Sequence, residues 1–181
     1  MLGLARASLV DAALNPDGPG PAIQGQDLAP ELLEECACFV TLTSHGSLRG
    51  CIGHVLPQKP LYQAILDSAR NAALHDPRFP AVQPAEVDDI RIEVSVLTKP
   101  KPLNFSSPEE LLEALQPHRD GVLLRVGGRN ATFLPQVWEK VPDKVTFLNR
   151  LSQKAGCASS AWRGQEAHVC VYQVESFEEK D

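Results

Sequence analysis

The sequence predicts an α+β fold, with a mostly antiparallel sheet and helices packed against it. Three observations support this fold class. Segments with strand and helix patterns alternate irregularly along the chain, and two expected strand pairs are joined by tight turns rather than by helices. No glycine-rich phosphate loop follows a strand, so the chain lacks the signature of a doubly wound nucleotide-binding sheet.

Apolar periodicity and turn residues place the individual elements. Pro60 and Ser107-Pro108 are typical helix starts, and Gly156 is a typical helix end. Glycine-containing turns at 44–46 and 127–129 join two β-hairpins. The expected helices cover residues 1–14, 60–73, 107 onward, 135–141 and 143–155. The expected strands cover residues 36–43, 47–52, 90–97, 121–126, 130–134 and 168–174.

Composition places the chain among globular proteins and excludes two classes of partner. Hydrophobic residues make up 43% and charged residues 22% of its 181 residues, which argues against disorder. The formal net charge of −6 disfavours a nucleic-acid binder, since neutralising phosphates needs a basic surface. No apolar run reaches the roughly 20 residues that span a bilayer, and residues 1–14 make a poor signal peptide. We expect a single cytoplasmic domain over residues 1–181.

The cysteines divide into two kinds. Five cysteines, an odd number in a chain without an export signal, predict reduced thiols rather than a disulfide framework. Cys36, Cys38, Cys157 and Cys170 stand among apolar residues, where small buried thiols are common. Cys51 differs, because glycines flank it on both sides and a cation precedes it.

The segment Leu48-Arg49-Gly50-Cys51-Ile52-Gly53-His54 carries the clearest chemistry. Gly50 and Gly53 permit a ligand or another chain segment to approach the backbone closely, and a nearby cation favours the thiolate, the reactive form of cysteine. The segment is therefore either a thiol nucleophile or anion site, or a buried thiol in a tightly packed strand. Cys51, His54 and His45 also offer zinc ligands, but no second close-spaced Cys/His pair completes a structural site, so we expect no metal.

Asp76-Pro77-Arg78-Phe79-Pro80 predicts a rigid polar turn. Its two prolines fix backbone dihedral angles and so pre-orient Asp76 and Arg78. Either the turn presents Arg78 to a ligand carboxylate or phosphate as a bidentate fork, or Asp76 caps the turn and Arg78 pairs with a neighbouring acid.

Two more polar side chains are site candidates. Glu93 lies on the polar face of strand 90–97, where it can act as a base or orient an arginine if that face lines a cleft; the alternative is a solvated strand face. Gln136 stands at a strand-to-helix junction, where its amide either contacts a ligand or caps the helix.

Five blocks of this sequence, in this order, resemble the AMMECR domain family. They are Leu48–Gly53, Asp76–Pro80, Ile92–Leu97, Thr132–Val137 and Lys154–Gly156. More closely, the chain resembles the bacterial branch of that family, the A proteins of the AmmeMemoRadiSam system. The likeness runs from the first helix to Phe177.

The resemblance implies two unequal subdomains around a shared cleft lined by the Leu-Arg-Gly-Cys-Ile-Gly motif. It implies no settled reaction and no cofactor. The cleft residues that it implies are Arg49, Cys51, Asp76, Arg78, Glu93 and Gln136.

We expect the cleft to bind a small anionic molecule through Arg49 and Arg78, with Glu93 and Gln136 positioning it. If the protein is an enzyme, we expect thiol-dependent group transfer or hydrolysis, with Cys51 attacking and Glu93 or a histidine assisting. The alternative is a non-catalytic partner of a Memo-like protein or a radical SAM enzyme, which the gene neighbourhoods of the family imply.

Overall fold

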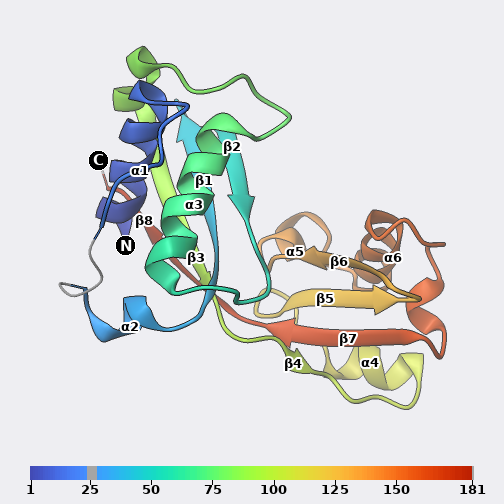
Figure 1. Ribbon diagram of the computed structural model, residues 1–181. Coiled ribbons are helices and arrows are strands. Elements are labelled where there is room, and N and C mark those ends of the chain that lie inside the picture. The colour runs from blue at the N-terminus through green and yellow to red at the C-terminus, as the bar shows by residue number, and fades with distance from the viewer. Residues whose placement is uncertain (24–27, 181) are drawn as a thin grey trace. The chain divides into compact units, whose positions relative to one another are not determined.

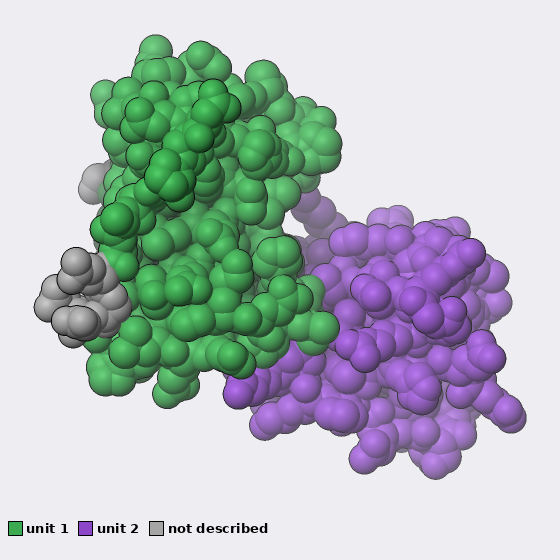
Figure 2. Space-filling model, in the orientation of Figure 1, with its two compact units in different colours: residues 1–97, 175–181 green, residues 98–174 purple. Residues whose placement is uncertain are grey.

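The computed structural model describes residues 1–23 and 28–180, and its chain forms two compact units. Unit 1 comprises residues 1–97 and 175–181, and unit 2 comprises residues 98–174 (Figure 2). Each unit has its own four-stranded sheet and its own apolar core. The predicted α+β class, with antiparallel strand pairing and packed helices, is confirmed.

Unit 1 is a sheet with two long helices against one face (Figure 1). Its strand order is β2-β1-β3-β8, and β1 pairs antiparallel with both β2 and β3. The strands are β1 (Ala37–Ser44), β2 (Ser47–Gly53), β3 (Ile90–Leu97) and β8 (Val174–Glu178). The helical segments are α1 (Leu2–Leu14), α2 (Pro30–Leu33), α3 (Leu61–Leu74) and the 3₁₀ turn η2 (Pro84–Asp89).

The alternation of the central strands decides which face of the unit 1 sheet is apolar. Val40 and Leu42 of β1 and Ile92 and Val94 of β3 are fully buried in the core with α1 and α3. Because side chains alternate along a strand, the residues between them point to the opposite face. The helix-covered face forms the core, and the other face carries polar side chains.

Unit 2 has the strand order β4-β7-β5-β6, with antiparallel pairs throughout. The strands are β4 (Lys101–Pro102), β5 (Gly121–Val126), β6 (Arg129–Phe133) and β7 (Ala167–Tyr172). The helical segments are α4 (Pro108–Ala114), α5 (Val137–Lys140), α6 (Lys144–Lys154) and η3 (Ala161–Arg163). Trp138 stacks on Phe147 in the core, with ring centroids 3.6 Å apart, and Trp162 is also fully buried there.

The sequence-based elements agree with the structure except near the C-terminus. The expected strand 168–174 is two strands, because β7 ends at Tyr172 and β8 begins at Val174 in the other sheet. Apolar alternation continues through this junction, so periodicity alone does not separate them. The short elements α2, η2, β4 and η3 were also not expected. Within the described residues, no helix has the length and apolar character needed to cross a membrane.

Candidate functional site

A β-bulge decides where Cys51 points. Thr43 pairs with Leu48, but the next pair along the ladder is Leu42 with Gly50, so Arg49 is an extra residue in β2. One extra residue reverses the faces of every following side chain. Gly50 consequently faces α3, and Cys51 lies opposite Thr41 on the polar face. Without the bulge, Cys51 would point into the core.

Gly50 is required by the closeness of α3. A Cβ atom at this position would lie 2.3 Å from the carbonyl oxygen of Ala72, a contact that backbone atoms cannot relieve without moving the helix. Gly53 is constrained in the same way, since its Cβ would lie 2.2 Å from the Cys38 carbonyl oxygen and 2.6 Å from the Phe39 ring. Both glycines of the motif therefore serve close packing within unit 1.

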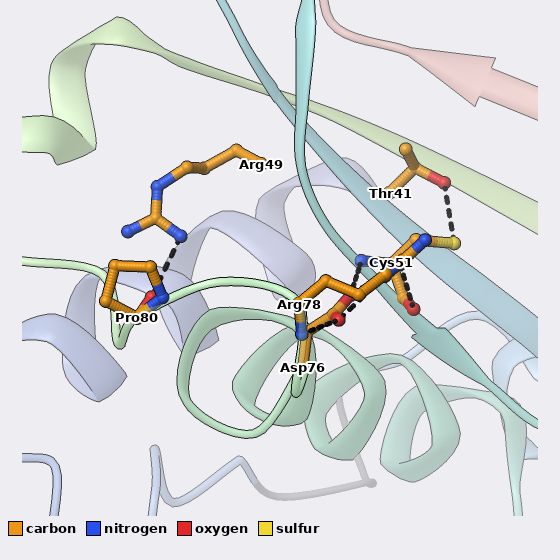
Figure 3. Close-up of polar contacts among 6 residues, drawn as sticks. All are labelled: Thr41, Arg49, Cys51, Asp76, Arg78 and Pro80. Carbon is orange, nitrogen blue, oxygen red and sulfur yellow. Dashed lines mark hydrogen bonds and ion pairs between the residues drawn. The ribbon is translucent and has the colours of Figure 1, made fainter.

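The Asp-Pro-Arg turn binds the backbone of Cys51. Asp76 follows α3 and accepts a hydrogen bond from the Cys51 amide at 2.9 Å, and Arg78 Nη2 donates to the Cys51 carbonyl at 3.5 Å (Figure 3). β2 is the edge strand of its sheet, so these two groups of Cys51 have no strand partner on that side. The turn satisfies them and fixes the backbone of the cysteine.

Asp76 and Arg78 form a bidentate ion pair. Arg78 Nε and Nη2 donate to the two carboxylate oxygens at 2.9 and 2.6 Å, and the Arg78 amide donates to Oδ1 at 3.1 Å. The Asp76 side chain is only 2% exposed, whereas that of Arg78 is 53% exposed. The Arg78 guanidinium, helped by the two backbone amides, holds the pKa of Asp76 well below its usual range despite burial. The same pair raises the pKa of Arg78.

Arg49 is fully engaged by its own surroundings. Nε and Nη2 bind the two carboxylate oxygens of Glu86 at 2.8 and 3.1 Å, and Nη1 donates to the Pro80 carbonyl at 2.9 Å. The guanidinium, followed by the Gln83 amide, lowers the pKa of Glu86. With a side chain only 12% exposed, Arg49 ties the bulge of β2 to the loop after Asp76 and to η2.

The polar face of the sheet carries a row of side chains across three strands. The Thr41 hydroxyl donates to the Cys51 sulfur at 3.4 Å, and Figure 3 shows the two side chains pointing toward each other. Thr41 is also the cross-strand partner of Glu93, so Cys51 and Glu93 flank it on neighbouring strands. Glu93 Oε1 accepts hydrogen bonds from Ser95 at 2.8 Å and, at 3.4 Å, from Ser176 of β8.

With this geometry in hand, comparison with known proteins identifies the family. The AMMECR1 family model matches residues 2–177. The chain belongs to the AMMECR1 family. A protein from Methanosarcina acetivorans is 40% identical over 98% of this chain and 89% of its own length. Protein MK0488 from Methanopyrus kandleri is 39% identical over 90% of this chain and 80% of its own length.

A solved structure shares this architecture. The crystal structure of PH0010, an uncharacterized protein from Pyrococcus horikoshii, superimposes with a TM-score of 0.88 at 34% identity. It covers 99% of this chain and 89% of the PH0010 chain. These relatives are archaeal, so they support the AMMECR1 family and not the narrower bacterial branch.

The AMMECR1 blocks in unit 2 meet around Lys154. Its ammonium group donates to the Thr132 carbonyl at 2.9 Å and lies 5.1 Å from the centre of the Phe133 ring. Burial lowers the pKa of Lys154. The carbonyl of Gly156, a residue with a φ of +74°, accepts a hydrogen bond from Arg129. These two blocks therefore fasten α6 and its end to β6.

The structure distributes the predicted site residues over both units. Five of them, Arg49, Cys51, Asp76, Arg78 and Glu93, belong to unit 1. Contacts join Cys51, Asp76 and Arg78, whereas Arg49 binds Glu86 and Pro80 instead. Gln136 belongs to unit 2, at the N-cap position of α5; it is exposed, and its side chain makes no capping hydrogen bond.

The two histidines near Cys51 in the sequence have local roles. The exposed His54 donates its backbone amide to the Cys38 carbonyl, and His45 forms the β1–β2 turn with a φ of 49°. Across residues 1–23 and 28–180, no three His, Cys, Asp or Glu side chains gather in a metal-binding arrangement. All five cysteines are free; Cys38 is buried, which raises its pKa to about 11, and the others are partly buried.

Two residues of the site, Thr41 and Glu86, are not among the candidates that the sequence predicts. Thr41 is the neighbour of Cys51 only because of the bulge, and no residue type in the hairpin predicts that bulge. For Glu86 a signal was present, because Gln83-Pro84-Ala85-Glu86 has the spacing of a helix start with a capping box, which the structure contains.

Proposed function

We propose that this AMMECR1 protein binds a small anionic molecule over the polar face of unit 1 and forms a covalent bond to it through the Cys51 sulfur. The observation that carries the proposal is the placement of this thiol. The bulge turns it onto the polar face, where Thr41 donates to its sulfur, while Asp76 and Arg78 bind the backbone of the same residue.

Arg78 supports the anionic character of the ligand. Its Nε and Nη2 bind Asp76, but Nη1 makes no hydrogen bond with the described residues, and half of the side chain is exposed. An ionised Cys51 thiol contributes to the raised pKa of Arg78, so the two groups lie within electrostatic range. Each of the three guanidinium nitrogens of Arg49 already donates to Glu86 or Pro80, and its side chain is largely buried, so we assign it the role of fixing the bulge.

The reaction we propose is acyl transfer. The thiolate of Cys51 attacks an ester or activated carbonyl carbon, the bond to the leaving group breaks, and the thiol proton passes to solvent. Water then hydrolyses the thioester and restores the thiol. Thr41 favours the anionic sulfur by donating its hydroxyl hydrogen. Glu93 lies beyond Thr41 in the row, so we place it at the far end of the ligand, not on the thiol.

The test compares two activated esters that differ in charge. Mono-4-nitrophenyl terephthalate carries a carboxylate that cannot reach its own ester, and 4-nitrophenyl benzoate is uncharged; both release 4-nitrophenolate on acylation. We expect a burst of nitrophenolate, acylation at Cys51 by peptide mass spectrometry, and faster acylation by the terephthalate ester. Cys51→Ser should remove the burst. Arg78→Gln should remove the preference for the terephthalate ester while Cys51 is still acylated.

Internal controls separate a specific site from general thiol reactivity. Cys38 is buried and should stay unmodified in the native protein, whereas Cys157 is partly buried in the other unit. Acylation of Cys157 at the rate of Cys51, or an equal rate for the two esters in the wild type, would contradict the proposal.

A second candidate is a non-catalytic partner of a radical SAM or Memo-like protein. The observation that favours it is the edge strand β2, which has no neighbouring strand on its outer side among the described residues and begins beside Leu48, 42% exposed. Such an edge can receive a strand from a partner. Co-purification that survives Cys51→Ala but is lost in Leu48→Lys would support this role. Co-purification unaffected by Leu48→Lys would reject binding through this edge.

A further inference from the structure

Unit 2 contains a hollow of about 600 Å³ that the sequence motifs do not mark. Its volume is in the range of small-molecule pockets. The hollow exists because β4 is only two residues long. The Leu103 amide still donates to the Val169 carbonyl, but beyond Leu103 the chain leaves β7 and turns toward α4. The first half of β7 is therefore flanked by a strand only on its β5 side, and the loop 103–108 forms a wall opposite it.

Two arginines and a histidine line this hollow. Arg125 and His168 are cross-strand partners on β5 and β7, and Arg163 comes from η3. Among the described residues that line the hollow there is no Asp or Glu, although the chain as a whole has a net charge of −6. Within residues 1–23 and 28–180, neither Arg125 nor Arg163 forms an ion pair.

The positions of the two arginines are compatible with ligand contact. Arg163 stacks on Trp162, with its guanidinium carbon 3.9 Å from the ring centre, which holds the guanidinium in place without using its hydrogen-bond donors. Arg125 is exposed and lies one residue before the end of β5. A neighbouring hollow of about 330 Å³ also includes Arg125 and His168, and the one carboxylate there, Glu166, does not line the larger hollow.

The walls of the hollow are largely apolar. Leu103, Phe105 and Val169 line it, and the first two also pack against the core of unit 2. Asn104 and Gln165 add neutral hydrogen-bonding groups. An inorganic ion would leave the apolar walls without contacts, whereas a ring or short alkyl group would cover them.

We propose that this hollow binds a small organic anion, with its phosphate or carboxylate between Arg125 and Arg163 and its apolar part on Leu103 and Phe105. Guanidinium groups recognise both anions through paired hydrogen bonds. The site belongs to unit 2 alone and does not depend on Cys51.

Isothermal titration of the full chain with three probes tests the proposal. Phenyl phosphate and benzoate carry an aromatic ring on each anion, and inorganic phosphate carries none. We expect phenyl phosphate to bind about tenfold more tightly than inorganic phosphate, because its ring covers the apolar walls. Tighter binding of phenyl phosphate than of benzoate would assign a phosphomonoester, and the reverse order would assign a carboxylate.

Variants locate the binding. Arg125→Gln and Arg163→Gln should each weaken phenyl phosphate binding roughly tenfold or more. Arg150→Gln removes an exposed arginine of α6 outside the hollow and should leave the affinity unchanged. Cys51→Ala should also bind as the wild type, which separates this site from the proposed thiol chemistry.

Three results would overturn the proposal. They are the absence of binding by all three probes at millimolar concentration, equal affinities for phenyl phosphate and inorganic phosphate, and an Arg150→Gln variant as impaired as Arg125→Gln. Circular dichroism of each variant ensures that a lost affinity is not a lost fold.

Discussion

The two units use their arginines in opposite ways. In unit 1, Arg49 and Arg78 each bind a carboxylate bidentately, and the pairs fix the bulge and the edge of β2. In unit 2, Arg125 and Arg163 line a hollow that includes no carboxylate from the described residues. The contrast teaches that an arginine in a recognisable motif can be held by a carboxylate of its own unit, as Arg49 is by Glu86, whereas the arginines without such a partner lie in segments that no motif marks.

The substitution with the largest expected effect is Gly50→Ala, which should destabilise unit 1 and leave unit 2 unchanged. Gly50→Ala places a Cβ 2.3 Å from the Ala72 carbonyl oxygen. We expect unit 1 to lose roughly 3 kcal/mol of unfolding free energy or more. Far-UV circular dichroism follows both units, whereas tryptophan fluorescence follows unit 2, since Trp138 and Trp162 belong to its core. The transition followed by circular dichroism should shift, and the transition followed by fluorescence should not.

A glycine without such neighbours provides the matched control for Gly50. Gly3 lies in α1 with no atom within 4 Å of its would-be Cβ, so Gly3→Ala should stabilise by about 0.5–1 kcal/mol. If the fluorescence transition moves with the dichroism transition in Gly50→Ala, the two units unfold together. The two units would then not differ in stability as we expect.

Asp76→Asn tests whether the buried carboxylate is structural. Arg78 holds the pKa of Asp76 below its ordinary value of about 4. A lowered native pKa means that the stabilisation is complete above that ordinary value and is lost as the pH falls through the native one. At pH 7 we expect a loss of about 2–3 kcal/mol, typical of hydrogen bonds to a charged group.

The effect of Asp76→Asn on stability should depend on pH. In urea unfolding, the difference in unfolding free energy between the wild type and Asp76→Asn should become smaller below about pH 4. Asp88→Asn, which alters an exposed carboxylate of η2, should change little at any pH. A gap that stays constant down to pH 2 would show that the charge of Asp76 is not what stabilises unit 1.

Paired arginine substitutions test the comparison directly. Arg49→Gln removes the bidentate pair with Glu86, and since Glu86 is partly exposed, we expect a loss of about 1.5 kcal/mol. Arg125→Gln should change stability by less than about 0.5 kcal/mol, because it breaks no ion pair. Equal losses in the two variants would mean that Arg125 is structural too.

The smallest expected effect concerns the hydroxyl beside the thiol. Thr41→Val keeps the shape of the side chain but removes its hydrogen bond to Cys51. We expect iodoacetamide to label Cys51 about threefold more slowly at pH 7, the size of one weak hydrogen bond. Thr43→Val, on the same strand, is the control; an unchanged labelling rate in Thr41→Val would remove Thr41 from the site.

Most of the fold was predictable because apolar periodicity is strong in the long elements. Residues 61–74 and 90–97 follow helical and strand patterns that their burial in the core confirms. The assignment of β7 and β8 to different sheets was not predictable, since the choice of neighbouring strand depends on tertiary packing and not on the pattern within the strand.

The candidate site was predictable in its members and not in its geometry. Cys51, Asp76 and Arg78 were named from residue type, and contacts join them. A two-residue turn at His45-Gly46 alone would pair Cys51 with Val40; the bulge at Arg49 pairs it with Thr41 instead. Since a register change of one residue reverses the faces, the direction of the thiol required the structure.

The order of the units along the chain has a consequence for biosynthesis. Unit 2 is an insertion within unit 1, because residues 98–174 lie between β3 and β8. Arg6 of α1 binds Glu179, which the ribosome adds 173 residues later, and Glu179 also accepts the Ile92 amide. The first sheet therefore lacks its fourth strand throughout the synthesis of the inserted unit. The unit that carries Cys51 is the one whose sheet is completed last.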